Sequence, residues 1–525
     1  MRTAMNHYHH AACTNPRLCC PQHAMLAFGA RMAIGETQPA PEGPQPSFRE
    51  GPDPNLSSFA AGDDRNTRDL FEVAEKERPV VVTGGTVLPM TSAETLPGHD
   101  VLIRDGRIEG VQATGGALPD GALSINASGR FVIPGLTNIH QHPPLRHIVG
   151  VYANMLGEGV SGEEVTLPYD LMMFQYLAAG ITRIQVMAGS PEDLANRENV
   201  RSGRYRGPHM RVGSPVIDSP EAIWASAITW YVNDADGGRR AARAIFEQGY
   251  DFAKPYTMLG RDGYFGLVEE CRALGIEIMG HIPQSVRPEE AFEAGQTGVA
   301  HCFEYFLHGR GADRFDPDTI AKRVKLSVNN GVTLQTTLEI ARVYEYDCGF
   351  IPASEMRFED TLDPVIRWLM REDSPFLQGW RANPVLMAGG ENVLDYSTRI
   401  CQALYAEGVR LLPGTDMSAS SITGEMSSHH EIRSMVERIG MSPFEALRAA
   451  TVQSAEYQGE GRVAGTIERG KRADLVILDA NPLEAIGNTT AIDTVVMGDA
   501  ILRRGARERG LARLKARYDA MPVPA

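Results

Sequence analysis

The feature that most constrains the fold is a regular alternation of short apolar segments with helical segments through the middle of the chain. Helical patterns such as Ala241 to Glu247 and Tyr264 to Ala273 separate most of the apolar segments. Eight strands that alternate with helices are typical of a parallel α/β barrel, so we predict a TIM (β/α)8 barrel. The predicted strands are residues 132–139, 181–188, 209–217, 250–255, 276–281, 297–301, 332–337 and 409–415.

Segments with β patterns flank the alternating region on both sides. On the N-terminal side, the Asp105–Gly106 pair lies between two apolar runs. Such a pair predicts a hairpin with a type I′ turn, because this turn needs positive φ at both central residues. On the C-terminal side, residues 474–478 and 494–502 each predict a short strand. We therefore expect the two ends to pair into one small β-sandwich domain, with the barrel inserted between them.

The domain organisation follows from these patterns. Residues 36–66 are rich in Pro, Gly, Ser, Asp and Asn, which is typical of a flexible segment. Ser442, Pro443 and Glu445 predict a helix start with a capping box. We predict a flexible leader at 1–77, a composite β domain from 78–134 and 462–510, a barrel at 135–461 with a helical insertion near its mouth at 340–395, and a C-terminal tail at 511–525.

Composition excludes several classes of partner. The chain carries 66 acidic against 51 basic residues, a formal net charge of −15, which argues against a nucleic-acid surface. No apolar run reaches the length of about 18 residues that a membrane span needs. The 7 cysteines are unevenly placed and predict no disulfide scaffold. We expect a cytoplasmic protein that acts on a small molecule, with homo-oligomers possible; an export signal or a misplaced start in the leader stays open.

The strongest local feature is the pair His140 and His142 at the end of the first predicted barrel strand. Side chains alternate along a strand, so these two imidazoles point the same way and can bind one metal ion. A His-x-His pair alone is more often incidental. Its position matters here, because barrel active sites form at the carboxyl ends of the strands.

Four further residues lie at the ends of later predicted strands: Lys254, His281, His301 and Asp416. Each alone has an ordinary explanation as a surface lysine, a core histidine or a helix-capping aspartate. A parallel barrel brings the ends of all its strands to one face, however. We therefore expect these residues to converge with His140 and His142.

At this point the chain resembles the amidohydrolase superfamily, and within it the imidazolonepropionase-like and prolidase-like branch. The resemblance covers roughly residues 78–505. It rests on Pro134-Gly135-Leu136 before the histidine pair, on Lys254, His281 and His301, on Gly414-Thr415-Asp416, on His430-Glu431 and Ser442 to Thr451, and on Gly465-Thr466-Ile467 leading to Lys471 through Val476.

The resemblance implies a metal-dependent hydrolase and a role for each residue. His140, His142 and Asp416 would hold one divalent metal, His281 and His301 a second, and Lys254 would bridge the two as a carbamate. Water activated by the metals would be the nucleophile. Asp416 would act as general base and then as general acid. Zinc is the expected metal for such ligands, while Mn²⁺, Co²⁺ or Fe²⁺ would also bind.

The substrate is less well defined by the sequence. Residues 180–187 depart from the family pattern, which commonly has an Arg-Asp pair after this strand, and Gln141 and Pro143-Pro144 also differ. We favour hydrolysis of an amide or peptide C–N bond in a dipeptide or acylated amino acid. The alternatives are cyclic amide (imidazolone-type), carbamate or phosphotriester hydrolysis at the same site, a mononuclear site without the carbamate, and a non-catalytic metal-binding barrel.

Overall fold

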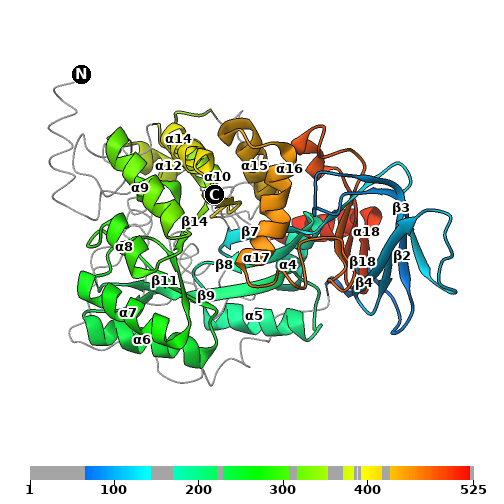
Figure 1. Cartoon of the computed structure of the whole chain (residues 1–525), viewed down its shortest axis with the longest axis horizontal. Helices are drawn as coiled ribbons and strands as arrows, with labels where there is room; N and C mark the ends of the chain where they lie inside the picture. Colours follow the sequence, from blue (N-terminus) through cyan, green and yellow to red (C-terminus); the bar gives the residue numbers. More distant parts are fainter. Residues whose placement is uncertain are drawn as a thin grey trace.

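The computed structural model describes residues 66–143, 169–220, 229–306, 316–352, 371–382, 387, 392–416 and 426–520. Two parts lie side by side, an α/β barrel and a β domain that contains both ends of the described chain (Figure 1).

The barrel consists of eight parallel strands in chain order, each paired with the next. Backbone hydrogen bonds connect the first strand to the segment after the last: Ile139 N donates to Pro413 O at 3.0 Å, and Asp416 N to His140 O at 2.9 Å. The TIM-barrel prediction is confirmed. The strands are β7 (Leu136–Gln141), β8 (Ile181–Val186), β9 (His209–Asp218), β11 (Phe252–Pro255), β12 (Glu277–Gly280), β13 (Gly298–Val299), β14 (Thr333–Gln335) and β15 (Arg410–Leu412).

One further strand, β10 (Thr229–Tyr231), pairs with β9 and was not predicted. Helices surround the barrel strands (Figure 1). They are α4 (Tyr169–Ala178), α5 (Pro191–Arg201), α6 (Ala235–Gln248), α7 (Arg261–Leu274), α8 (Pro288–Ala294), η5 (Cys302–Tyr305), α9 (Pro317–Asn329), α10 (Leu338–Asp347), α12 (Pro375–Ala382), α14 (Val393–Ala406), α15 (Ser427–Ser434), η9 (Met435–Ile439), α16 (Pro443–Arg448), η10 (Ala449–Gln453) and α17 (Ser454–Tyr457).

The β domain is one nine-stranded sheet made from both ends of the chain. Its apolar side chains, among them Val82, Val101, Ile103 and Leu475, form a core separate from that of the barrel. The predicted composite β domain is therefore present. Its strands are β1 (Glu72–Val73), β2 (Val80–Val87), β3 (Leu96–Arg104), β4 (Arg107–Ala113), β5 (Leu123–Asn126), β6 (Phe131–Pro134), β16 (Asp474–Leu478), β17 (Ile492–Met497) and β18 (Ala500–Arg503), with the helical turns η3 (Arg68–Leu70) and η11 (Ile486–Thr490) beside them.

The predicted hairpin lies between β3 and β4. Asp105 and Gly106 have φ of 47° and 72°, as a type I′ turn requires, and Arg104 pairs with Arg107 across the turn.

The predicted strand at 132–139 is two strands, and this corrects the sequence interpretation. β6 pairs with β16 in the β domain, whereas β7 pairs with β8 in the barrel. The chain changes sheet at Gly135, where a Cβ atom would lie 2.1 Å from Oγ1 of Thr182. Apolar character continues through both strands, so periodicity alone could not locate the break.

The boundaries at the two ends also differ from the prediction. The leader was predicted to extend to residue 77, but β1 pairs with β18 through Glu72 and Val73. The predicted tail from residue 511 belongs to a helix, α18 (Arg504–Asp519), whose Leu514 and Tyr518 pack against Leu171 of the barrel. The folded part of the described chain therefore includes residues 72–77 on the N-terminal side and residues 511–519 on the C-terminal side.

The region predicted as a helical insertion, 340–395, contains most of α10, all of α12 and the start of α14. Within it, Tyr344 and Tyr346 belong to the main apolar core.

Within the described ranges, no helix is long and apolar enough to cross a membrane.

Candidate active site

All six residues singled out from the sequence lie at carboxyl ends of barrel strands. His140 is in β7 and Lys254 is in β11, while the other four lie one to four residues after the end of a strand. A parallel barrel gathers these ends at one face, which is why residues so distant in sequence can meet. The four that follow a strand are His142 after β7, His281 after β12, His301 just after β13, and Asp416 after β15.

The carboxylate of Asp416 is the centre of the group. Its Oδ1 lies 2.9 Å from Nε2 of His140 and 3.0 Å from Nε2 of His142. The two imidazole nitrogens are themselves 3.3 Å apart. Two imidazole nitrogens and a carboxylate oxygen thus face one small space, as metal ligands do.

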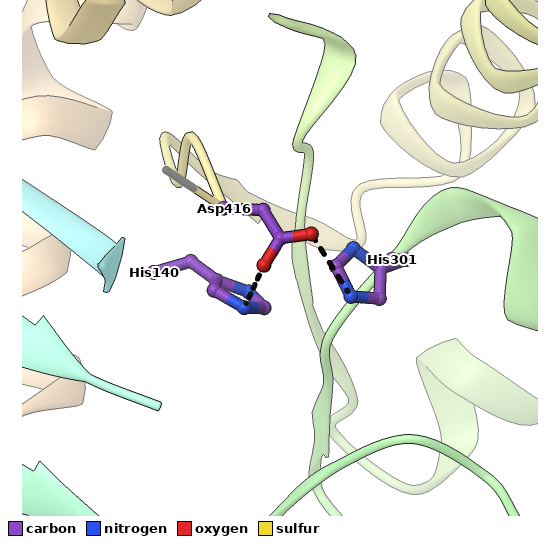
Figure 2. A group of neighbouring side chains, drawn as sticks. All are labelled: His140, His301 and Asp416. Atoms are coloured by element: carbon purple, nitrogen blue, oxygen red, sulfur yellow. Dashed lines mark ion pairs between the residues drawn. The ribbon is translucent and has the colours of Figure 1, made fainter. Parts of the chain in front are cut away.

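His301 approaches the same carboxylate from the other side of the barrel. Its Nε2 lies 3.8 Å from Oδ2 of Asp416, and its ring centroid is 4.8 Å from that of His140 (Figure 2). Within the described part of the chain, His140, His301 and Asp416 form a group that could hold a metal ion. His301 therefore lies with the first predicted ligand set as well as beside His281.

His281 extends the site toward the middle strands. Its ring centroid lies 4.8 Å from that of His301 and 4.1 Å from that of Tyr256. Its Nδ1 is 3.0 Å from Oε1 of Glu304 and 3.1 Å from Oγ1 of Thr257. In histidines that bind metals, the ring nitrogen opposite such contacts is the ligand atom, which here is Nε2.

Lys254 is buried, with 1% of its surface exposed, and its Nζ lies 6.0 Å from the centroid of the Tyr256 ring. Burial lowers the pKa of Lys254 to about 8, although the carboxylates of Asp416 and Glu304 act in the opposite direction. With this pKa, about a tenth of the molecules carry a neutral Lys254 at pH 7, far more than at the usual pKa of lysine.

The protonation states of the two histidines and of Asp416 are those that bind a cation. Burial lowers the pKa of His140 to about 3 and holds the pKa of His301 well below its usual value, so both rings are neutral. For Asp416, burial opposes ionisation, but His140 and His301 outweigh it and keep the pKa well below its usual value. Neutral imidazoles around an ionised carboxylate are the donor set that a divalent metal needs. In addition, His140 Nδ1 is buried without a hydrogen-bond partner among the described residues, and the polar contacts of this ring are those of Nε2 with Asp416 and His142.

The last strand end shows why the local sequence is Gly-Thr-Asp. A Cβ atom on Gly414 would lie 2.5 Å from Cβ of His140, so only glycine permits this approach. Asp416 has a φ of 59°, a left-handed conformation that Asp adopts more readily than most residues. Between them, Oγ1 of Thr415 accepts hydrogen bonds from Asn138 at 2.9 Å and from Gln141 at 2.8 Å.

The arrangement of a parallel barrel with histidines and an aspartate at its strand ends can be compared with known proteins. Residues 131–501 match the amidohydrolase family. The chain belongs to the amidohydrolase family. It is accordingly a hydrolase that acts on carbon–nitrogen bonds, as the sequence predicted.

Individual relatives of this amidohydrolase differ in their reactions. A 5-methylthioadenosine/S-adenosylhomocysteine deaminase of Symbiobacterium thermophilum is 26% identical over 426 residues, 76% of this chain and 85% of that protein. The structure of bottromycin amidohydrolase has a TM-score of 0.65 at 21% identity and covers 90% of this chain and 98% of its own. A Xaa-Pro dipeptidase with bound methionine in its active site has a TM-score of 0.61 at 16% identity, with 81% and 100% covered. The two structures show a shared fold.

Several residues around the site of this amidohydrolase were not found from the sequence. Glu304 and Thr257 contact His281, and Thr337 contacts His301 through Oγ1 and Nδ1 at 2.9 Å. Glu304 is in η5, three residues after His301, and its Oε2 also accepts from Ile282 N at 3.0 Å. The only sequence signal for Glu304 is an acidic residue close after a predicted ligand.

Proposed function

We propose that this protein is a binuclear metal-dependent amidase that cleaves the amide or peptide C–N bond of a small dipeptide-like or acylated amino acid substrate. The observation that carries the proposal is the buried Lys254, which has a lowered pKa and interacts electrostatically with His281, His301 and Asp416. A buried ammonium group loses its hydration, so a lysine at this place costs folding free energy. Such a cost is expected where the lysine has a function.

Under this proposal, His140, His142 and Asp416 would hold one metal, and His281 and His301 would hold the second. Lys254 would join this ligand set as a carbamate: its neutral Nζ attacks carbon dioxide, an N–C bond forms while one C=O π bond opens onto oxygen, one N–H proton leaves to solvent, and the carbamate carries the negative charge. The bound metals supply Lewis acidity, which lowers the pKa of water and polarises a carbonyl. Zinc is the metal we propose, since imidazole and carboxylate ligands suit it.

Asp416 is the residue placed to move the proton. It is ionised, as its lowered pKa indicates, and its side chain keeps 12% exposure while those of His140 and His301 have 1% or less. His142 is more open still, with 31% of its side chain exposed. A substrate therefore reaches the site beside these two residues. Asp416 accepts the proton of the attacking water and returns it to the leaving nitrogen.

The choice of an amide substrate is supported by the two structural neighbours, whose names describe hydrolysis of amide or Xaa-Pro bonds. Their low identity shows the fold only, so the substrate is our proposal. A second candidate is deamination of a purine nucleoside, because the Symbiobacterium relative of that name aligns over 76% of the chain. Both reactions break a C–N bond with water.

The experiment that separates them incubates zinc-loaded protein with Xaa-Pro dipeptides, N-acyl amino acids, 5′-methylthioadenosine and S-adenosylhomocysteine. Release of a free amino acid together with a second amine or acid is expected. Release of ammonia from the nucleosides alone would replace the amidase proposal with the deaminase. Turnover of none of these substrates by the zinc-loaded protein would contradict both.

Asp416→Asn is the test variant, and we expect kcat to fall by about 10²–10⁴-fold, the usual contribution of a general acid–base group. The matched control is Asp395→Asn in α14, an exposed aspartate paired with Arg399 at 2.9 Å. Equal activity of the two variants would remove the assigned role of Asp416.

A further inference from the structure

Helix α10 begins in an unusual way directly beside the site. Thr337, which precedes its first residue, has a φ of 45°, and its side chain makes no capping hydrogen bond. A threonine at this position ordinarily uses its hydroxyl to accept from the first backbone N–H groups of the helix. Here Thr337 Oγ1 lies instead 2.9 Å from Nδ1 of His301. In histidines that bind metals, the ring nitrogen opposite such a hydrogen bond is the ligand atom, which here is Nε2, 3.8 Å from Oδ2 of Asp416.

A different helix supplies the missing cap. The carboxylate of Glu431, in α15, accepts hydrogen bonds from Leu338 N at 3.0 Å and Glu339 N at 2.7 Å, the first two residues of α10. It also accepts from the hydroxyl of Thr336. A helix N-terminus favours negative charge, but burial raises the pKa of Glu431 to about 7, so the capping rests on the oxygens that accept these hydrogen bonds.

The contacts of Glu431 account for the backbone of Thr337. Left-handed φ is strained for a β-branched residue, and such conformations persist only where the surroundings hold them. Glu431 binds the residues on both sides of Thr337, with Thr336 before it and Leu338 after it. The strained residue is thereby held with its hydroxyl toward His301.

The same helix reaches the other half of the site. Ser428, three residues before Glu431 and so on the same face of α15, accepts from Nδ2 of Asn138 at 2.8 Å. Oδ1 of Asn138 in turn accepts from His140 N at 3.1 Å and from Thr415 N at 3.3 Å. One turn of α15 is thus connected, through Asn138, to the end of β7 that carries His140 and, through Thr337, to His301 after β13.

We infer that Glu431 and Ser428 are positioning residues of the metal site, and that Glu431 acts on His301 through Thr337. Ser428 positions His140 and the segment before Asp416, and Glu431 positions His301. Helix α15 thereby fixes the distance between His140 and His301. The inference rests on the proposed function, since it needs a metal to be bound.

The test measures the affinity of each folded protein for Zn²⁺ by competition with a chelator, independently of turnover. Because groups that orient ligands contribute about 10–100-fold to metal affinity, we expect Glu431→Gln to weaken binding by at least tenfold. In glutamine, one oxygen is replaced by an amide that would face a backbone N–H. Glu437→Gln is the matched control, because Glu437 is an exposed glutamate paired with Arg433 in the adjoining turn.

A second pair of variants keeps the test valid if Glu431→Gln folds poorly. Thr337→Val removes the hydroxyl while it keeps the shape, and we expect weaker Zn²⁺ binding. Thr337→Ser restores the hydroxyl and should restore the affinity. A purely structural role would lower the unfolding midpoint of Thr337→Val and leave its Zn²⁺ affinity unchanged.

The outcomes separate the two proposals. Wild-type protein that binds no Zn²⁺ would overturn the proposed function. Wild-type protein that binds Zn²⁺, with Glu431→Gln and Thr337→Val binding it equally well, would overturn the positioning role alone. Weakening in both variants, with recovery in Thr337→Ser, is the result that this role predicts.

Discussion

At the scale of single residues, the site depends on the close approach of Gly414 to His140 as much as on the ligand residues themselves. His140 can reach Asp416 only because the chain passes it without a side chain at Gly414. Tight packing of this kind makes the position sensitive to a single added methyl group.

Gly414→Ala tests this point. The new Cβ atom would lie 2.5 Å from Cβ of His140, so one of the two strand ends must move. Overpacking of this kind costs about 1–3 kcal/mol. We expect a loss of unfolding free energy in that range, measured by chemical denaturation, together with weaker metal binding.

Gly487→Ala is the matched control. Gly487 has open space around its added Cβ atom, so this variant should be as stable as the wild type. A Gly414→Ala protein with wild-type stability and metal content would contradict the close approach of Gly414 and His140.

At this scale the sequence predicted the candidate ligands but not the groups that orient them. His140, His281 and Asp416 could be predicted because each is a ligand-type residue at the end of an apolar strand. Glu304 and Glu431 lie in helical turns, where an acidic residue is usually solvated. Only their contacts across the fold distinguish them, and these have no periodic signal in the sequence.

At the scale of elements, the start of α16 was predicted in detail. Ser442 Oγ accepts from Glu445 N at 3.3 Å, and Glu445 Oε2 accepts from Ser442 N at 2.8 Å, with Pro443 in the first position. The capping box was visible in the sequence because it needs fixed residue types at fixed spacing.

Ser442→Ala tests this cap. Loss of an N-cap hydroxyl costs about 1 kcal/mol. We expect that decrease in unfolding free energy by urea denaturation, with unchanged catalytic activity, because the cap is distant in sequence from every proposed ligand. Ser442→Asp keeps an acceptor and should retain most of the stability; an equal loss in both variants would contradict the capping role.

The element boundaries were harder to predict. The apolar run that includes β6 and β7 is continuous, and the change of sheet at Gly135 depends on contact with Thr182 in another strand. The short strand β1 has two residues, both exposed, and so shows no apolar pattern.

At the scale of the whole molecule, the barrel and the β domain are joined by buried polar contacts as well as by the chain. His429 of α15 is one of them, with Nε2 2.9 Å from Ala179 O and Nδ1 3.0 Å from Oγ1 of Thr489, in η11 beside the β domain. Burial lowers the pKa of His429 to about 4. The folded protein therefore resists protonation of this ring.

This joint predicts a pH dependence of stability. Because the folded pKa of His429 is about 4, below the unfolded value of about 6.5, the unfolded chain takes up the proton first as the pH falls. The contribution of neutral His429 to the free energy of unfolding is complete above about pH 6.5, and about 2 kcal/mol of it should be lost by pH 5.

His429→Gln should reduce the difference in unfolding free energy between pH 7 and pH 5 by roughly that amount, whereas His99→Gln, at a partly exposed histidine of the β domain, should not. The measurement is urea denaturation at both pH values. An unchanged difference in His429→Gln would contradict a neutral, buried ring.

The most direct test of the account is the metal content of the protein, measured by elemental analysis on wild type and on Lys254→Ala purified without chelator. We predict about two divalent ions per wild-type chain, the content of a two-metal hydrolase, and a sharp fall in the variant. About one ion, unchanged in Lys254→Ala, would contradict the binuclear site and the role of Lys254. No metal after repletion with Zn²⁺ would contradict the account as a whole.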